Sequence, residues 1–252
     1  MLPCYSTVRL RAVIKGMHHL RGDRPPEREV PIRTQHLAMG LKTSLGKNAD
    51  GLCARAALSV AFCGLLRISE YAMCDGGLFD EAKLPTVGDV GFGSDEHGEY
   101  AAVDIRAAKK GAKSRGKSSR VLLRDGELLQ PVTALREMLT RRRGPGKREP
   151  LFMWKGNPLS KAVVTSLVKL VMGAAGQDPR LYNSHGLRIG GATAALAAGV
   201  SPEAIRVMGR WDSDVYRIYC RRSRQVALQL GTVIASTGFE SLDDAFTTEE
   251  LL

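Results

Sequence analysis

The hydrophobic periodicity of this chain changes twice along its length, and these changes limit the folds that it can adopt. Apolar residues recur at helical spacing over residues 34–66. Between Thr86 and Arg124 the period becomes two, which predicts three short antiparallel strands over residues 87–92, 101–107 and 119–123. Helical periodicity returns from Pro131 onward. We therefore expect an α+β fold that is mainly α, with a small three-stranded antiparallel sheet inserted between two helical halves.

Capping and breaking residues suggest where the helices begin and end. Thr34 is expected to cap a helix that runs to about Leu45. Asp50 is expected to cap the next helix, which is apolar nearly all round and should cross the core before ending at residues 67–70. Pro131 suits the first turn of a helix that runs to about Arg142. One face of a further helix is expected to consist of Leu159, Val163, Leu167 and Leu170. Three more helices are expected to be capped by Ser184, Ser201 and Ser213.

The charge of the chain is strongly positive. The formal net charge is +11, and the last 13 residues hold five acidic residues and no basic one, so the rest of the chain is still more basic. Such a charge predicts a polyanionic partner, most simply nucleic acid. Among the side chains of residues 106–124, eight are basic and none is acidic, which concentrates charge on the predicted sheet.

The cysteines and the apolar runs exclude several classes of protein. The five cysteines form no C-x-x-C pair, so neither a disulfide framework nor a zinc site is expected, and a reduced compartment fits best. The sequence contains no run of about 18 apolar residues, so a membrane span is not expected. The N-terminus lacks the pattern of a signal peptide, so secretion is not expected.

Four short stretches carry the candidate chemistry. They are residues 64–70 (GLLRISE), 105–111 (IRAAKKG), 184–193 (SHGLRIGGAT) and 208–221 (MGRWDSDVYRIYCR). Arginine is suited to hold a phosphodiester, because its planar fork of donors matches phosphate and keeps its charge. His185 and Arg188 would lie on one side of a helix N-terminus, which itself favours an anion. Trp211 offers an N–H donor, and Tyr219 offers a hydroxyl that can act as a nucleophile.

In this order, the four stretches resemble the catalytic motifs of the tyrosine recombinase (phage integrase) family. The similarity is greatest to its eukaryotic mobile-element branch, of crypton or DIRS type, and it spans residues 31–222. The resemblance implies a helical catalytic domain that cuts and rejoins DNA through a 3′-phosphotyrosyl intermediate. It implies neither a metal nor another cofactor, because the bond energy is kept in the covalent intermediate.

The family's roles carry over by position. Arg67 and Arg188 would bind the scissile phosphate. Lys109 would protonate the leaving 5′ oxygen, and His185 would assist removal of the proton from the nucleophile. The remaining roles fall to three residues: Trp211 as a donor to a phosphate oxygen, Tyr219 as the nucleophile and Glu70 as an acidic support of the site.

Two of these assignments have rivals within a few residues. Lys110 and Lys113 compete with Lys109 as the general acid. Tyr216 competes with Tyr219, because the two lie three residues apart on a short helix; the following Cys220-Arg221 favours Tyr219. The candidates for contacts with DNA phosphates are Arg106, Lys110, Lys113, Arg115 and Lys117.

The resemblance also predicts the domain organisation. Residues 1–30 would be a short helical and linker segment, the remnant of a DNA-binding arm, and residues 31–224 the catalytic domain. Residues 225–252 would form a C-terminal helix and an acidic tail, which either docks on a neighbouring subunit or is a disordered end. So short a preceding segment would fit a natural single-domain form, a shortened piece or a decayed element.

The leading hypothesis is a site-specific DNA recombinase or integrase. The alternatives are a type IB topoisomerase-like enzyme and a recombinase-derived DNA-binding protein without cleavage activity. Expected partners are double-stranded DNA and further copies of the chain, as a tetramer on DNA, and no membrane. The expected location is the nucleus in a eukaryote and otherwise the cytoplasm.

Overall fold

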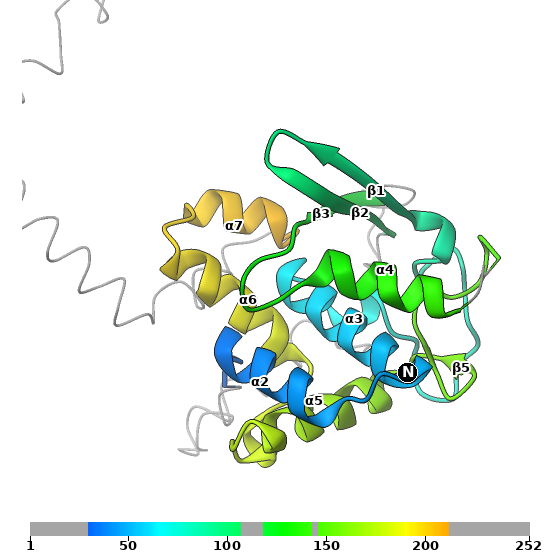
Figure 1. The fold of residues 1–252 in the computed structure, drawn as a ribbon, viewed down its shortest axis with the longest axis horizontal. Helices are drawn as coiled ribbons and strands as arrows, with labels where there is room; N and C mark the ends of the chain where they lie inside the picture. The colour runs from blue at the N-terminus through cyan, green and yellow to red at the C-terminus, as the bar shows by residue number, and fades with distance from the viewer. Residues whose placement is uncertain (1–29, 107–117, 143–145, 212–252) are drawn as a thin grey trace, which may run out of the picture.

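Helix α3 (Ala49–Cys63) forms the centre of the molecule (Figure 1). The structure is a computed structural model and describes residues 30–106, 118–142 and 146–211. Eleven of the fifteen residues of α3 are buried, as its apolar sequence predicted. The predicted cap at Asp50 is wrong: the Asn48 side chain accepts from the Gly51 N–H at 2.8 Å. Asp50 instead accepts from the backbone N–H of Lys155.

Helices α2 (Thr34–Ser44) and α5 (Lys161–Ala174) pack against each other below α3 in the view of Figure 1. Thr34 begins α2 but does not cap it, since the N-cap position is held by Arg33 without a side-chain hydrogen bond. Ser160 caps α5. The two helices approach so closely at Gly40 that a Cβ added there would lie 2.1 Å from the Val171 carbonyl oxygen.

The predicted apolar face of α5 needs correction. Its buried positions are Val164, Leu167, Val168, Val171 and Met172. Leu159 is buried but precedes the helix. Val163 packs only at the core margin, and Leu170 is 51% exposed. The helix therefore presents a face rotated from the one that we predicted.

The three predicted strands form one antiparallel sheet in the order β1 (Val90–Asp95), β2 (Gly98–Arg106) and β3 (Ser118–Leu123). β1 starts later than predicted, because Val87–Asp89 form a 3-10 turn (η2) closed by Thr86 and Asp89. α4 (Pro131–Arg141) packs on α3 and contacts β2, and Pro131 lies in its first turn as predicted. The fold is thus α+β and mainly α, with the small sheet beside the helices (Figure 1).

The remaining elements complete the helical part. A short hairpin, β4 (Met153–Trp154) and β5 (Asn157–Pro158), precedes α5, and the 3-10 turn η3 (Pro179–Leu181) follows it. Helix α6 (His185–Ala197) packs on α3, and α7 (Pro202–Met208) packs on α6. Ser201 caps α7 as predicted, accepting from the Ala204 N–H at 3.2 Å.

Two consecutive glycines explain how closely α6 approaches its neighbours. A Cβ at Gly190 would lie 2.1 Å from the Ile32 carbonyl oxygen, and one at Gly191 would lie 2.2 Å from the Phe62 carbonyl oxygen. Glycine costs a helix stability relative to alanine, but here it permits contact between two backbones. The N-terminal half of α6 is therefore fixed against the C-terminal end of α3.

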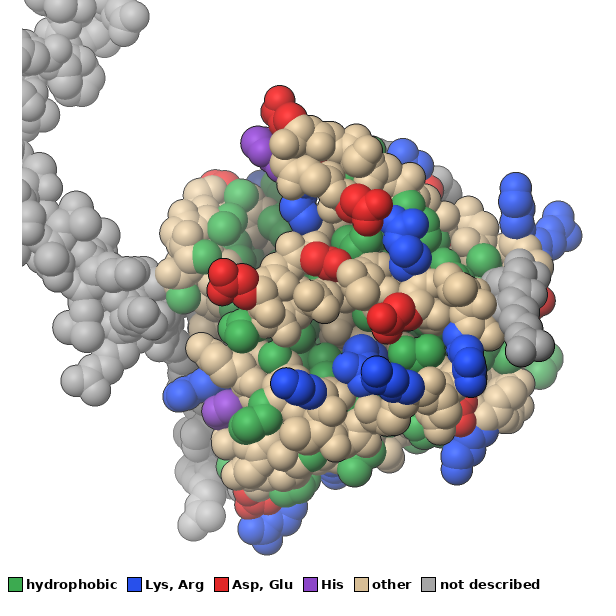
Figure 2. All heavy atoms as spheres, viewed as in Figure 1, with side chains coloured by type: hydrophobic (Ala, Val, Ile, Leu, Met, Phe, Trp, Pro, Cys, Tyr) green, Lys and Arg blue, Asp and Glu red, His purple; other side chains and the backbone are tan. Residues whose placement is uncertain are grey.

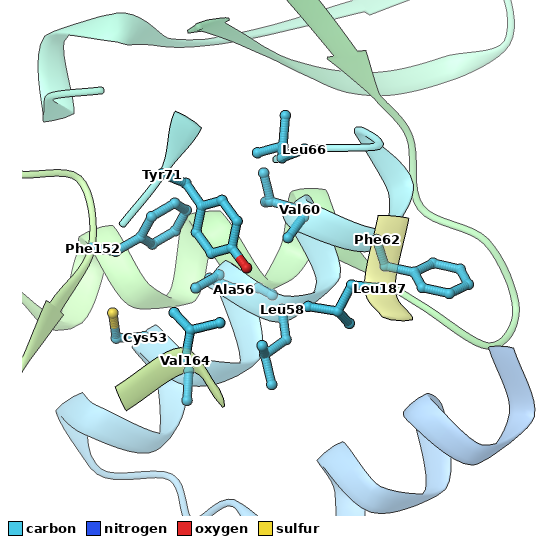
Figure 3. Close-up of a cluster of buried hydrophobic side chains, with 14 of the residues drawn as sticks. Cys53, Ala56, Leu58, Val60, Phe62, Leu66, Tyr71, Phe152, Val164 and Leu187 are labelled. Carbon is cyan, nitrogen blue, oxygen red and sulfur yellow. The ribbon is translucent and has the colours of Figure 1, made fainter. Parts of the chain in front are cut away.

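The main core surrounds α3 (Figure 3). Side chains of α3 meet Phe152, Val164 and Leu187, which come from three separate segments. The Tyr71 and Phe152 rings pack edge to face with centroids 6.3 Å apart. Within the described ranges, every helix is too short or too polar to cross a membrane.

Candidate functional site

The segment that carries Arg67 leaves α3 through a sharp turn. α3 ends at Cys63, four residues before the predicted end, and Leu65 adopts a left-handed conformation with φ of 50°. Leu66 packs in the main core, whereas Leu65 packs in a second cluster with residues of α6 and α7. Because the two leucines are buried in different clusters, the backbone that follows them is fixed. Arg67 is extended and precedes the 3-10 turn η1 (Ile68–Glu70).

Glu70 is buried and is held by two arginines. Its carboxylate accepts from the Arg67 backbone N–H at 2.7 Å and from Arg67 Nη1 at 2.8 Å. It also accepts from Arg210 Nη2 at 3.0 Å. Burial opposes ionisation, but the charge and hydrogen bonds of Arg210, together with those of Arg67, hold the pKa of Glu70 below its ordinary value. The carboxylate is therefore charged at neutral pH.

Arg188 is almost completely buried in the first turn of α6, with 1% of its surface exposed. Nη1 donates to the Leu65 carbonyl and Nη2 donates to the Gly209 carbonyl. Arg67 donates through Nη2 to the next carbonyl, that of Arg210, at 2.6 Å. The two predicted phosphate-binding arginines are thus brought together, although helices and a sheet separate them in the sequence.

Trp211 covers Arg188. The guanidinium carbon lies 3.9 Å from the centroid of the Trp211 ring, within the range of a cation–π interaction. The ring also packs against the cluster of Leu65 and Ile205. Trp211 therefore contacts both the predicted site, through Arg188, and the apolar cluster that holds α7 in place.

Arg210 was missed by sequence reasoning, although it stands inside a quoted motif. Its guanidinium pairs with Glu70 and donates to the carbonyls of Leu65 at 3.1 Å and Met208 at 2.8 Å. The available signal was its position between a helix-terminating glycine and Trp211. No local spacing indicates its contact with Glu70.

His185 is the first residue of α6, one turn before Arg188, and is half-buried. The prediction that Ser184 caps this helix is wrong, because Ser184 makes no side-chain cap hydrogen bond. Asn183 does so instead, accepting from the His185 N–H at 2.9 Å.

The described basic residues of the sheet are paired with acids. Arg106, a candidate for DNA contact, donates to Asp89 at 2.7 Å. Across β2 and β3, Arg120 pairs with Asp104. On the face that Figure 2 shows, Lys and Arg side chains are likewise interspersed with Asp and Glu. These ion pairs locally offset the charge that the sequence concentrates on the sheet.

Several predicted residues lie outside the described part of the chain. They are the DNA-contact and general-acid candidates Lys109, Lys110, Lys113, Arg115 and Lys117, the nucleophile candidates Tyr216 and Tyr219, and the cap Ser213. Within the described residues, His, Cys, Asp and Glu side chains form no group of three that could hold a metal. A cavity of about 610 Å³ between α2, α3 and α4 contains none of the candidate site residues.

Comparison with known proteins gives matches in structure but not in sequence. No protein-family model matches the chain, and no curated protein matches it. Its fold is similar to that of the XerH site-specific recombinase bound to palindromic difH substrate in a post-cleavage complex. That likeness has a TM-score of 0.58 at 18% identity and covers 83% of this chain but only 54% of XerH.

Two further solved structures are similar. XerA recombinase matches with a TM-score of 0.58 at 16% identity, over 93% of this chain and 78% of XerA. The Tn1549 transposon integrase in complex with transposon right end DNA matches with a TM-score of 0.52 at 15% identity, over 85% of this chain and 69% of that chain. The fold described above is therefore similar to that of these recombinases and this integrase.

Proposed function

We propose that this protein is a site-specific DNA recombinase or integrase that cleaves and rejoins DNA through a tyrosine. One observation carries the proposal: Arg67, Glu70, Arg188 and Trp211, predicted from ordered motifs, converge on one short turn within a fold similar to recombinases. Unrelated structural roles would not require two distant segments to supply arginines to the same turn of a third.

The proposed reaction assigns a role to each residue. The Tyr219 oxygen attacks the phosphorus and the bond from phosphorus to the 5′ oxygen breaks, which leaves a 3′-phosphotyrosyl link. His185 takes the tyrosine proton, and Lys109 gives a proton to the leaving 5′ oxygen. Arg67 and Arg188 offset the charge that builds on the non-bridging oxygens. A 5′ hydroxyl of another strand reverses the step.

Arg188 needs a rearrangement in this scheme. A phosphate must reach its guanidinium past the indole of Trp211, which covers one face. We propose that Trp211 swings away or slides to place its own N–H on the phosphate.

The finer features follow from the sequence resemblance. We propose residues 31–224 as the catalytic domain, residues 1–30 as a helical and linker segment before it, and residues 225–252 as a C-terminal helix and acidic tail. We also propose membership of the eukaryotic mobile-element branch, a tetramer on double-stranded DNA and a nuclear location.

The test is capture of the covalent intermediate. The full chain is incubated with a pool of randomised duplexes, each carrying a nick that releases the short 5′-hydroxyl fragment after cleavage. A denaturing gel should then show a protein–DNA adduct. The adduct should disappear in Tyr219→Phe and persist in the matched control Tyr216→Phe.

Each other outcome points elsewhere. Loss of the adduct in Tyr216→Phe alone would transfer the nucleophile to that residue. Relaxation of supercoiled plasmid without exchange between duplexes would favour the topoisomerase-like alternative. Binding to duplexes with no adduct anywhere in the pool would overturn the enzymatic proposal in favour of a DNA-binding protein.

A further inference from the structure

Arg210 links the two segments that carry the predicted phosphate-binding arginines. Its side chain reaches across to Glu70 and to the Leu65 carbonyl, both on the segment that follows α3. Its own carbonyl oxygen accepts from Arg67 Nη2 at 2.6 Å. The Leu65 carbonyl accepts from Arg188 as well. One residue therefore contacts Arg67 directly and shares an acceptor with Arg188.

The backbone of Arg210 indicates that this position is determined by its surroundings. Its φ is 56°, a left-handed backbone conformation that residues other than glycine and asparagine rarely adopt. The preceding residue, Gly209, has an ordinary φ of −78°. The chain thus places arginine where glycine would be less strained, and the side-chain contacts of Arg210 hold it there.

The charges around Glu70 indicate what Arg210 contributes to the site. A buried carboxylate paired with Arg67 alone would neutralise the cation that is needed for a phosphate. Arg210 supplies a second positive charge to the same carboxylate, and its side chain is only 15% exposed. Arg67 is more accessible, with 29% of its side chain exposed. The cluster of Glu70, Arg67 and Arg210 therefore keeps a net positive charge, on the side where Arg67 meets solvent.

We infer that Arg210 is a positioning residue for the reaction proposed above: it balances the charge of Glu70 and orients Arg67 toward the phosphate. The inference rests on the proposed function. Arg210 does not bind the phosphate itself, because its guanidinium nitrogens are directed to Glu70 and to the backbone carbonyls of Gly64, Leu65 and Met208.

The experiment compares Arg210→Gln and Arg210→Lys with the full wild-type chain. The rate of adduct formation at saturating nicked duplex should fall about tenfold or more in Arg210→Gln, while duplex affinity stays nearly unchanged. Arg210→Lys keeps the charge and should restore part of the rate. The acid limb of the pH–rate profile should move to higher pH in Arg210→Gln, because Glu70 loses a cation. Arg206→Gln, on the exposed side of α7, is the matched control.

A second measurement does not depend on DNA cleavage. Carbon-13 NMR of the Glu70 carboxyl should show a higher pKa in Arg210→Gln than in the wild type, with Arg210→Lys between them. Thermal unfolding checks that each variant is folded. If Arg210→Gln does not fold, the comparison is made between wild type and Arg210→Lys. An unchanged Glu70 titration, or a wild-type rate and pH profile in Arg210→Gln, would overturn the inference. If the wild type forms no adduct, the proposed function is refuted. The comparison of the Glu70 pKa between wild type and variants then still tests whether Arg210 balances the charge of Glu70.

Discussion

Arg67 and Arg188 donate to the carbonyl oxygens of two consecutive residues, Arg210 and Gly209. The turn that follows α7 therefore sets the spacing between the two guanidiniums. Arg188 approaches it from a buried helix, and Arg67 from a partly exposed extended segment. The site is built around this turn, and the stability of the turn and the chemistry of the site should change together.

Arg188→Lys should destabilise the fold although it keeps the charge. An ammonium cannot reproduce the fork that serves the Leu65 and Gly209 carbonyls, and an unpaired buried carbonyl costs about 2 kcal/mol. Urea unfolding should show a loss of that order. Arg180→Lys, at an exposed ion pair with Asp178, is the control and should change nothing measurable. Equal effects of the two substitutions would refute the structural role of Arg188.

Trp211 should report the approach of a phosphate to Arg188. The chain has two tryptophans, Trp154 and Trp211, and the second is stacked on the guanidinium. Addition of a short random-sequence duplex should change the emission of Trp154→Phe, where Trp211 is the remaining fluorophore. The same titration of Trp211→Phe should give little change. A response that survives only in Trp211→Phe would place the DNA away from this site.

Glu70 should make stability depend on pH in the acid range. Its folded-state pKa lies below the ordinary value of 4.5, so its contribution is fully present above that value and is lost as pH falls through the folded pKa. The difference in unfolding free energy between wild type and Glu70→Gln should therefore be largest near neutral pH and shrink below pH 4.5. Glu127→Gln, at an exposed position, is the control for the removal of one carboxylate. A constant difference across this range would contradict the prediction.

Gly190→Ala and Gly191→Ala should each destabilise the protein by about 2 kcal/mol, because the new methyl group would meet a backbone carbonyl that cannot move aside easily. Gly173→Ala in α5 is the matched control, since its methyl group would meet only the Pro179 ring at 3.2 Å. There the gain in helix propensity should offset the contact. Chemical unfolding of the three variants measures the difference, and a similar loss in all three would show that backbone contact is not the cause.

The sequence by itself determined the order and type of the elements. Helical and strand periodicities are local properties, so the sheet between residues 86 and 124 and the buried helix before Arg67 could be recognised from neighbouring residues. The same holds for Pro131 in a first helical turn and for the Ser201 cap. The ordered motifs also singled out Arg67, Glu70, Arg188 and Trp211.

Only the tertiary structure decided what depends on residues far apart in the chain. Asn48 and Asn183, not Asp50 and Ser184, cap their helices, because the backbone direction at each entry selects the acceptor. The glycine pair in α6 is required by the close approach of the carbonyls of Ile32 and Phe62. The contact of Arg210 with Glu70 joins segments that no local spacing relates. Such contacts form when the core closes around α3, and that closure brings the arginines to one turn.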